Sequence, residues 1–503
     1  MTRRWPDRLN IDDHLLRQRL TEGSGDRVAL RLDDRDVTYV EIDRAASGFA
    51  SLLTEVGVEP GERVLLVMPD GLEYVAAVFG VLRVGAVGLL INPGLTPGDM
   101  AGIAGLARAT GAVVHQSHLR ALEAALISAG IQPPSLIVVD DDFVLPDLDV
   151  PTFDTAALDP ALWIFSGGTT GLPKAVVQTH RSFANTTELY GKGTLGLTAE
   201  DTTIAVPKLY FGYAMGSNLF FPFSVGASAV LFADQSTPAA LFDRIEKHGA
   251  TVLVNVPSAI NQMLAHVDTA NRDLSTLRVA TSAGEALPDT LYHQWMERFG
   301  VELLDGLGTA EMWHIFVSNQ IGAVRPGTLG RVVPGFEIKV CDADGEAVPT
   351  GEVGRLWVKG DSLGLGYFEN PDATAEAFRG EWFAGGDLVS IDGDGYVTHR
   401  GRADDAIKVK GRWFRPQEVE SALLDHPAVS ECAVVAIADP AGLAKPVAFV
   451  VATDVTESEL IDWALSHLEA YKHPRRIHFV DRLPQTHLGK VDRGALRSLA
   501  AGG

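Results

Sequence analysis

The amino-acid sequence predicts an α/β protein: a large N-terminal domain of two doubly wound α/β subdomains and a small β-rich lobe, then a C-terminal α+β domain. Three observations lead to this fold class. First, 503 residues are too many for one hydrophobic core. Second, apolar strand-like runs alternate with helical segments up to about residue 325, which is typical of parallel sheets covered on both faces. Third, glycine- and proline-rich turns then separate short alternating strands.

The first predicted subdomain spans about residues 1–160. An amphipathic helix is expected over 39–56, and a buried helix that leads into a strand is expected over 74–91. Continuous apolar runs predict buried strands at 63–68, 112–115 and 135–139.

The second subdomain is expected over 161–325, with buried strands at 203–206, 229–232, 251–254 and 277–280. The β-rich lobe follows over 326–403, with strands at 336–340 and 354–358. Residues 404–503 predict a separate domain, with helices at 418–424 and 457–468 and a strand at 431–437.

Composition excludes several classes of protein. The formal net charge of −23 disfavours nucleic acid and anionic membrane surfaces as partners. The two cysteines, Cys341 and Cys432, form neither a disulfide framework nor a thiolate zinc site, which fits a reducing compartment. The N-terminus lacks an apolar signal core, and the most apolar window contains Arg83 and three glycines, so no membrane span is predicted. We expect a cytoplasmic protein.

A glycine-rich segment, residues 165–174, is the strongest chemical signal. It follows an apolar run and holds three glycines, three hydroxyls and Lys174 within ten residues. Glycines let several backbone N–H groups face one anion, and hydroxyls and a lysine add donors and charge, so the segment predicts a phosphate-binding loop. A flexible surface turn is the alternative. It is not a Walker A loop, because Ala175 follows the lysine.

Two further segments hold candidate ligand-binding residues. Residues 282–285 (Ser-Ala-Gly-Glu) follow a predicted buried strand, at the sheet edge where open α/β folds bind ligands. An ordinary βα turn explains them equally well. In residues 305–314, close glycines allow a backbone to approach a flat ligand, and Glu311 suits Mg²⁺ beside a triphosphate. His314 alone would be read as a packed core histidine.

Two more groups occur near the C-terminal part of the chain. Asp387 suits the two hydroxyls of a ribose, and Arg402 could reach the same sugar, although a charged loop at a domain junction is an equal explanation. Lys490 lies on a glycine-containing loop, where a lysine is usually a solvated surface charge.

The order and spacing of these five groups resemble the adenylate-forming superfamily: acyl-CoA synthetases, aryl-CoA ligases, peptide-synthetase adenylation domains and luciferases. The resemblance covers nearly the whole chain. It implies an AMP-binding N-terminal domain over 1–403 and a mobile C-terminal lid over 404–503 that carries the catalytic lysine, with a hinge at Asp404. The implied catalytic residues are Lys490, Glu311 (also the Mg²⁺ ligand) and Lys174. The implied nucleotide-binding residues are Ser166, Gly168, Thr169, Thr170, Gly171, Ser282, Ala283, Gly284, Glu285, Asp305, Gly306, Leu307, Gly308, Thr309, Asp387 and Arg402.

Within the superfamily, residues 208–216 and 305–316 most resemble benzoate- and other aryl-CoA ligases. The subgroup's pocket for an aromatic ring would be lined by Tyr210, Phe211, Gly212, Tyr213, Gly306, His314 and Ile315. Aromatic faces and a glycine slot suit a flat ring, although one or two of the three aromatic residues at 210–213 would fit an ordinary core cluster equally well.

The resemblance implies activation of an aromatic acid by MgATP to an acyl-adenylate, with release of pyrophosphate, and then transfer to coenzyme A after the lid rotates. Lys408, Lys410, Gly411, Lys472, Arg475 and Arg476 would face coenzyme A. The last three of these residues fit a basic surface patch equally well. A homodimer is common among such ligases.

Three hydroxyls that the superfamily places near the nucleotide are absent, at Gly167, Ala310 and Gly385. Each missing hydroxyl could cost a phosphate hydrogen bond of about 0.5–1.5 kcal/mol net, and sequence drift compensated by water is the alternative explanation at any single site. Three alternatives therefore stay open: transfer of the aryl group to a carrier protein, activation of nitrite as in ATP-dependent diazotases, or non-catalytic nucleotide binding. Retention of the catalytic residues speaks against the last.

Overall fold

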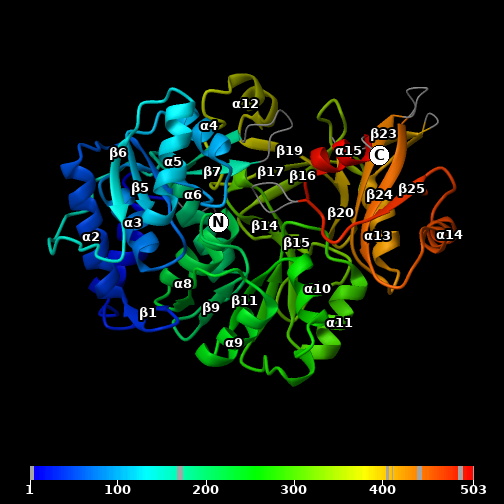
Figure 1. Ribbon diagram of the computed structural model, residues 1–503, viewed down its shortest axis with the longest axis horizontal. Helices are drawn as coiled ribbons and strands as arrows, with labels where there is room; N and C mark the ends of the chain where they lie inside the picture. The colour runs from blue at the N-terminus through cyan, green and yellow to red at the C-terminus, as the bar shows by residue number, and fades with distance from the viewer. Residues whose placement is uncertain are drawn as a thin grey trace.

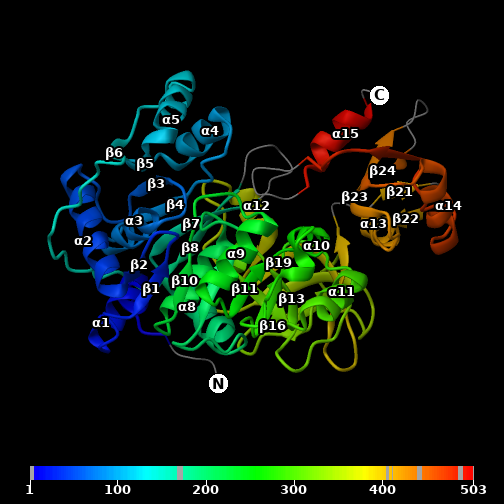
Figure 2. The ribbon, with the colours of Figure 1, turned by 60° about the horizontal axis from the view of Figure 1, so that its bottom comes forward.

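The computed structural model describes residues 5–166, 174–403, 407–409, 412–438, 444–484 and 491–501 (Figure 1). The chain up to β20, which ends at Arg402, forms two large sheets and a smaller one, and the last part of the chain forms a separate body beside them (Figure 2). This arrangement agrees with the fold class expected from the sequence.

The first large sheet has six strands in the order β6-β5-β3-β4-β7-β8. They are β6 (Ser135–Val139), β5 (Gly111–His115), β3 (Arg63–Val67), β4 (Val87–Leu90), β7 (Pro160–Ser166) and β8 (Lys174–Thr179). The pairs are parallel except for β7 and β8, which are antiparallel. Parallel strands buried on both faces explain their continuous apolar runs.

The second large sheet has nine strands in the order β15-β14-β13-β12-β11-β9-β10-β1-β2. They are β15 (Arg331–Val332), β14 (Ile315–Ser318), β13 (Leu303–Gly308), β12 (Val279–Ser282), β11 (Val252–Asn255), β9 (Thr202–Ala205), β10 (Ser228–Val230), β1 (Val28–Arg31) and β2 (Asp36–Thr38). Two strands from the start of the chain thus complete this sheet, because β1 pairs in parallel with β10. The predicted boundary near residue 160 therefore does not coincide with a division between the two sheets, because each sheet contains strands from both sides of it. The boundary stays a prediction.

Helices cover both sheets and leave a shared core between them. α4 (Pro97–Ala107) and α5 (Gln116–Ser128) pack on the outer face of the six-stranded sheet. α9 (Pro238–His248), α10 (Pro257–Ala265) and α11 (Asp289–Phe299) pack on the outer face of the nine-stranded sheet. α2 (Tyr39–Glu55) and α3 (Leu72–Arg83) join the largest core, which has residues from the inner faces of both sheets. A capping box at Thr38 explains why α2 begins where the sequence predicts.

The β-rich lobe is a five-stranded antiparallel sheet. It contains β16 (Glu337–Cys341), β17 (Gly354–Lys359), β18 (Phe378–Arg379), β19 (Trp382–Ile391) and β20 (Val397–Arg402). α12 (Pro371–Ala377) lies beside it, next to the six-stranded sheet (Figure 1).

The C-terminal body consists of β23 (Val429–Ala438), β24 (Ala444–Ala452) and β25 (Arg476–Phe479), with α13 (Pro416–Leu424), α14 (Glu457–His467) and α15 (Arg493–Ala501). β21 (Ile407–Val409) and β22 (Arg412–Phe414) form a hairpin before it. The Asn261 amide on α10 donates a 2.9 Å hydrogen bond to the Ser430 carbonyl, which joins the two bodies. Within the described part of the chain, no helix has the length and apolar character needed to cross a bilayer.

Candidate active site

The predicted phosphate-binding segment connects two antiparallel strands. β7 ends at Ser166 and β8 begins at Lys174, and these two residues are register partners. The segment therefore has both ends fixed by a sheet. Residues 167–173, which include Gly167, Gly168, Thr169, Thr170 and Gly171, lie outside the described residues. The Ser166 hydroxyl is buried and has no hydrogen-bond partner among the described residues, so it can serve a ligand at the base of the loop.

Lys174 and Glu311 both contact the side chain of Tyr367. Lys174 Nζ is 4.8 Å from the ring centre of Tyr367, and the Tyr367 hydroxyl donates a 2.7 Å hydrogen bond to Glu311 Oε1. The structure thus brings two predicted catalytic residues together. Sequence reasoning missed Tyr367, because the neighbouring glycines Gly364 and Gly366 suggest a turn and do not suggest a functional residue.

Ser282 and Asp305 end neighbouring parallel strands and are register partners. Both are buried, and among the described residues neither Ser282 Oγ nor Asp305 Oδ1 has a partner in hydrogen-bonding geometry. The Ser282 hydroxyl is nevertheless near enough to act against the rise in the pKa of Asp305. Burial dominates and raises the pKa of Asp305 to about 8. Two unsatisfied polar atoms at a strand end suit the edge of a nitrogen heterocycle.

The other half of the 282–285 segment has a structural use. The Glu285 carboxylate accepts hydrogen bonds of 3.0 and 3.2 Å from the Ser258 amide and hydroxyl at the start of α10. Gly284 has φ +89°, a conformation that glycine adopts without strain. Glu285 thus has a structural role in this turn, and the ligand-binding role of the segment stays a prediction.

Asp305 gives a pH prediction. Its pKa is raised on folding, so its contribution to stability is present below about pH 4 and is lost as the pH rises towards about 8. We expect the free energy of unfolding of wild type to fall relative to Asp305→Asn between pH 5 and 8, measured by urea denaturation. A constant difference across that range would contradict the buried, neutral carboxyl.

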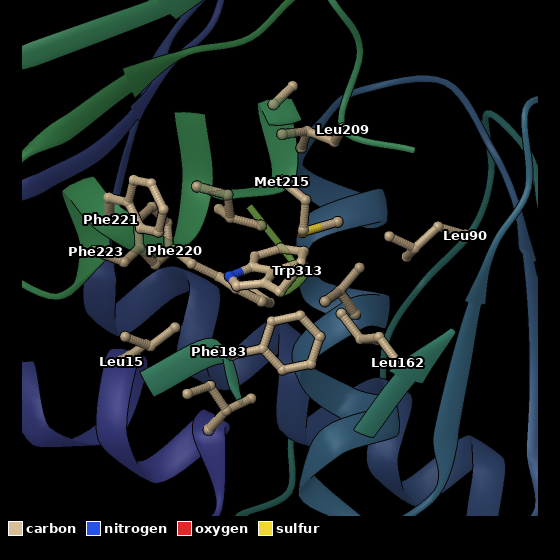
Figure 3. Close-up of a cluster of buried hydrophobic side chains, with 14 of the residues drawn as sticks. Leu15, Leu90, Leu162, Phe183, Leu209, Met215, Phe220, Phe221, Phe223 and Trp313 are labelled. Atoms are coloured by element: carbon tan, nitrogen blue, oxygen red, sulfur yellow. The ribbon is translucent and has the colours of Figure 1, made fainter. Parts of the chain in front are cut away.

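A strained turn connects the phosphate side with the aromatic side. Trp313 has φ +67° and ψ −49°, and the His314 N–H donates 2.8 Å to the Met312 carbonyl. This is the γ-turn with positive φ, which is rare and costs on the order of 1–3 kcal/mol for a residue other than glycine. The buried indole offsets this cost: it packs edge-on against Phe183 at 4.2 Å, in the centre of the cluster in Figure 3.

His314 lies among aromatic rings on the far side of this turn. Its ring centre is 4.7 Å from that of Phe221, 5.4 Å from that of Tyr213 and 5.5 Å from that of Tyr190. His314 Nε2 lies 3.0 Å from the Tyr213 carbonyl, which only accepts, so Nε2 carries the proton. Burial lowers the pKa of His314 to about 3, so the imidazole is neutral at ordinary pH and does not act as a cation there.

Three more residues that were predicted to line the ring pocket lie next to residues 313–315. The Tyr213 hydroxyl lies 2.6 Å from Thr281 Oγ1, and Gly212 faces Trp313, whose carbonyl oxygen would lie 3.6 Å from an added Cβ. Gly306 faces Ile315, whose Cγ2 would lie 3.3 Å from an added Cβ. Tyr210 and Phe211 instead pair with each other at 4.7 Å. Neither makes a ring contact with His314 in the described part of the chain, so their role as pocket residues stays a prediction.

The proposed ribose residues also come together. Asp387 and Arg402 are register partners on β19 and β20, and Arg402 Nη1 is 3.7 Å from Asp387 Oδ1. His399 Nε2 lies 3.2 Å from the same carboxylate oxygen. Two of the three positions that lack the hydroxyl expected near the nucleotide are Gly385 and Ala310. The Gly385 carbonyl accepts a hydrogen bond from Arg355, and the Ala310 carbonyl accepts one from Gln178.

Comparison with known proteins decides the family. Residues 17–368 match the model of the AMP-binding enzyme family, and residues 418–490 match that of the AMP-binding enzyme C-terminal domain. The chain belongs to the AMP-binding enzyme family. The predicted membership is confirmed.

Two relatives and two solved structures are similar to this AMP-binding enzyme along its whole length. Benzoate–CoA ligase of Thauera aromatica is 37% identical, covering 98% of this chain and 96% of that protein. The 4-hydroxybenzoate–CoA/benzoate–CoA ligase of Rhodopseudomonas palustris is 33% identical, with coverage of 96% and 93%. An anthranilate CoA ligase in complex with anthranoyl-AMP matches with a TM-score of 0.92 and 36% identity, covering 99% of each chain. A benzoate CoA ligase from Burkholderia xenovorans LB400 matches with a TM-score of 0.88 and 38% identity, covering 97% and 99%.

The residues expected on the coenzyme A side of this AMP-binding enzyme are only partly described. Lys408 lies on β21, whereas Asp404, Lys410, Gly411 and Lys490 lie outside the described residues. Lys472 makes ion pairs of 2.6 and 3.1 Å with Glu418 and Glu469, which reduces its attraction for a phosphate. Arg475 contacts His473 at 2.6 Å, and Arg476 is exposed on β25.

A substitution at Gly308 tests the packing of the turn at Trp313. A Cβ at Gly308 would lie 2.6 Å from the His314 carbonyl oxygen, so the two strands would have to separate. We expect Gly308→Ala to lower kcat/KM for the acid by about tenfold, equivalent to about 1.4 kcal/mol. Gly98→Ala, where an added Cβ meets nothing nearer than 3.9 Å, should match wild type. Equal kinetics of both variants would contradict this packing.

Proposed function

We propose that this protein is an AMP-forming aryl-CoA ligase. It joins an aromatic carboxylic acid of the benzoate type to ATP, releases pyrophosphate, and then transfers the acyl group from AMP to the thiol of coenzyme A. The observation that carries this proposal is the strained turn at Trp313, which connects Glu311, next to Tyr367 and Lys174, with His314 among aromatic side chains. An enzyme that activates an aromatic acid needs these two environments next to each other.

In the first half-reaction the acid carboxylate attacks the α-phosphorus of ATP. Both reactants are anions, so the site has to supply positive charge where they meet. Lys174 stands at the mouth of the phosphate loop, and Lys490 is proposed to contact the acid carboxylate and the α-phosphate. The adenine would lie against 305–308, and Asp387 with Arg402 would hold the ribose.

The residues of the site fit a magnesium ion. Within the described chain no three His, Cys, Asp or Glu side chains gather as a metal site, so a cation would depend on Glu311 together with ligand oxygens. Mg²⁺ is usually held in this way, by one or two carboxylates plus substrate phosphates and water. When bound, it would neutralise the triphosphate charge; Glu311 is the residue that would hold it.

The second half-reaction needs the thiol of coenzyme A at the same carbonyl carbon. We propose that the C-terminal domain rotates about Asp404, which withdraws Lys490 and brings residues 408–413 to the site. Lys408, Lys410, Gly411, Lys472, Arg475 and Arg476 are the proposed contacts of coenzyme A. A cytoplasmic location, a homodimer and loading of a carrier protein stay predictions.

The test is pyrophosphate release from MgATP with benzoate, hydroxybenzoates, aminobenzoates, cinnamate, a medium-chain acid and nitrite, with and without coenzyme A. We expect release with at least one benzoate-type acid, and an aryl-CoA thioester by mass spectrometry when coenzyme A is present. Release with nitrite only would favour the diazotase-type reaction. Adenylate without thioester would point to a carrier protein, and silence with every acid would overturn the proposal.

A further inference from the structure

Tyr367 touches both charged residues of the phosphate side. Its hydroxyl donates a 2.7 Å hydrogen bond to Glu311 Oε1, and its ring centre is 4.8 Å from Lys174 Nζ. The side chain is buried, with a relative exposure of 8%, and Glu311 is buried to a similar extent at 7%. Tyr367 therefore contacts a buried carboxylate through its hydroxyl and an ammonium group through its ring.

The backbone around Tyr367 holds the same two residues. The Gly364 N–H donates 2.9 Å to the Glu311 carbonyl, so the turn that carries Glu311 is fixed from this side. Leu365 and Phe368 donate to β8 carbonyls at 2.9 Å each, and Lys174 is the first residue of β8. Residues 364–368, which we term the clamp segment, thus join Glu311 to the strand that begins with Lys174.

The Tyr367 hydroxyl has a single hydrogen, which it donates to Glu311 Oε1. A protonated hydroxyl donates to only one carboxylate oxygen at a time, so Glu311 Oε2 is left for another partner. The hydrogen bond also limits the rotation of the carboxylate, which reduces the ordering needed when a cation binds.

We infer that Tyr367 is a positioning residue, which orients Glu311 towards a cation on the ATP phosphates and holds Lys174 towards the same phosphates. This inference rests on the proposed function. It assigns the hydroxyl to Glu311 and the ring to Lys174, so the two contacts can be removed separately.

The experiment compares three variants. Tyr367→Phe removes the hydroxyl and keeps the ring, and Tyr367→Leu removes both. Tyr39→Phe is the matched control, because the Tyr39 hydroxyl is buried and donates 2.6 Å to the Ala227 carbonyl within the core instead of at the site. Half-saturation by Mg²⁺ is measured from pyrophosphate release at fixed ATP. Binding of Mn²⁺ in the presence of ATP is measured directly by electron paramagnetic resonance, without any turnover.

We expect Tyr367→Phe to raise the half-saturating metal concentration about tenfold in both measurements, as for loss of a hydrogen bond to a charged group. The KM for the acid should be unchanged, and Tyr39→Phe should match wild type. Tyr367→Leu should in addition raise the KM for ATP. In the Glu311→Gln background, Tyr367→Phe should add no further weakening of Mn²⁺ binding.

Metal binding by Tyr367→Phe equal to that of Tyr39→Phe would overturn the inference. So would a further weakening in the Glu311→Gln background, because the hydroxyl would then act through another group. If wild type released no pyrophosphate with any acid, the proposed reaction would fail, and Mn²⁺ binding with ATP would still decide the role of Tyr367.

Discussion

Lys490→Ala is expected to lose adenylate formation by a factor on the order of 10²–10³, while transfer of a supplied acyl-adenylate to coenzyme A continues at nearly the wild-type rate. The reason is that the positive charge is needed where the carboxylate and the α-phosphate meet, and the second half-reaction has no such meeting of anions. The measurement is pyrophosphate release for the first half-reaction and thioester formation from synthetic acyl-adenylate for the second.

Lys192→Ala is the matched control for this prediction. Lys192 makes a 2.7 Å ion pair with Glu188 one helical turn away, so its loss changes the same charge without touching the proposed site. Both half-reactions should be unaffected. Equal losses of the two half-reactions in Lys490→Ala would contradict the role assigned to this lysine.

Arg83→Ala is expected to lower the free energy of unfolding by about 3–5 kcal/mol. Arg83 is fully buried at the end of α3 and makes ion pairs of 2.9 Å with Asp12 and 2.6 Å with Asp43. Among the described residues, its removal leaves the buried Asp12 carboxylate without a cation and leaves Asp43 with only the longer 3.7 Å ion pair to Arg17, and that loss is the main cost. Urea denaturation followed by circular dichroism measures the change.

Arg8→Ala provides the comparison. Arg8 also makes a 2.9 Å ion pair, with Asp154, but both side chains are more than half exposed, at 55% and 79%. Solvent screens that pair, so its loss should cost at most about 1 kcal/mol. Equal losses of stability in the two variants would contradict the claim that burial makes the Arg83 ion pairs costly to remove.

Local patterns predicted most elements, because a buried strand or an amphipathic helix leaves its period in the sequence. The fold class is confirmed, and strands such as β6 have the expected bounds. The sheet that each strand joins could not be predicted as well from the sequence. The pairing of Leu30 with Ala229 in β1 and β10 connects residues about two hundred positions apart, and no local pattern encodes it.

In the candidate site, too, some features were predicted from the sequence and others were not. Asp387 and Arg402 were expected to act on one sugar, and the register of β19 and β20 places them together. Tyr367 and the conformation of Trp313 were not predicted. A contact with a residue 56 positions away has no local signal, and a tryptophan at positive φ contradicts local preference and persists only because its surroundings hold it.

The exchange of strands between the two large sheets limits how this protein can be divided. A chain cut near residue 160 would leave the six-stranded sheet without β7 and β8, and the nine-stranded sheet would lose β1 and β2. Neither fragment would then be a complete domain, so the two halves should regain structure only when mixed, as in a split reporter. A cut between β20 and β21 breaks no strand pairing of these two sheets. Both large sheets should therefore melt as one cooperative unit, and a chimaera with a relative is expected to fold better with its junction between β20 and β21 than with one near residue 160.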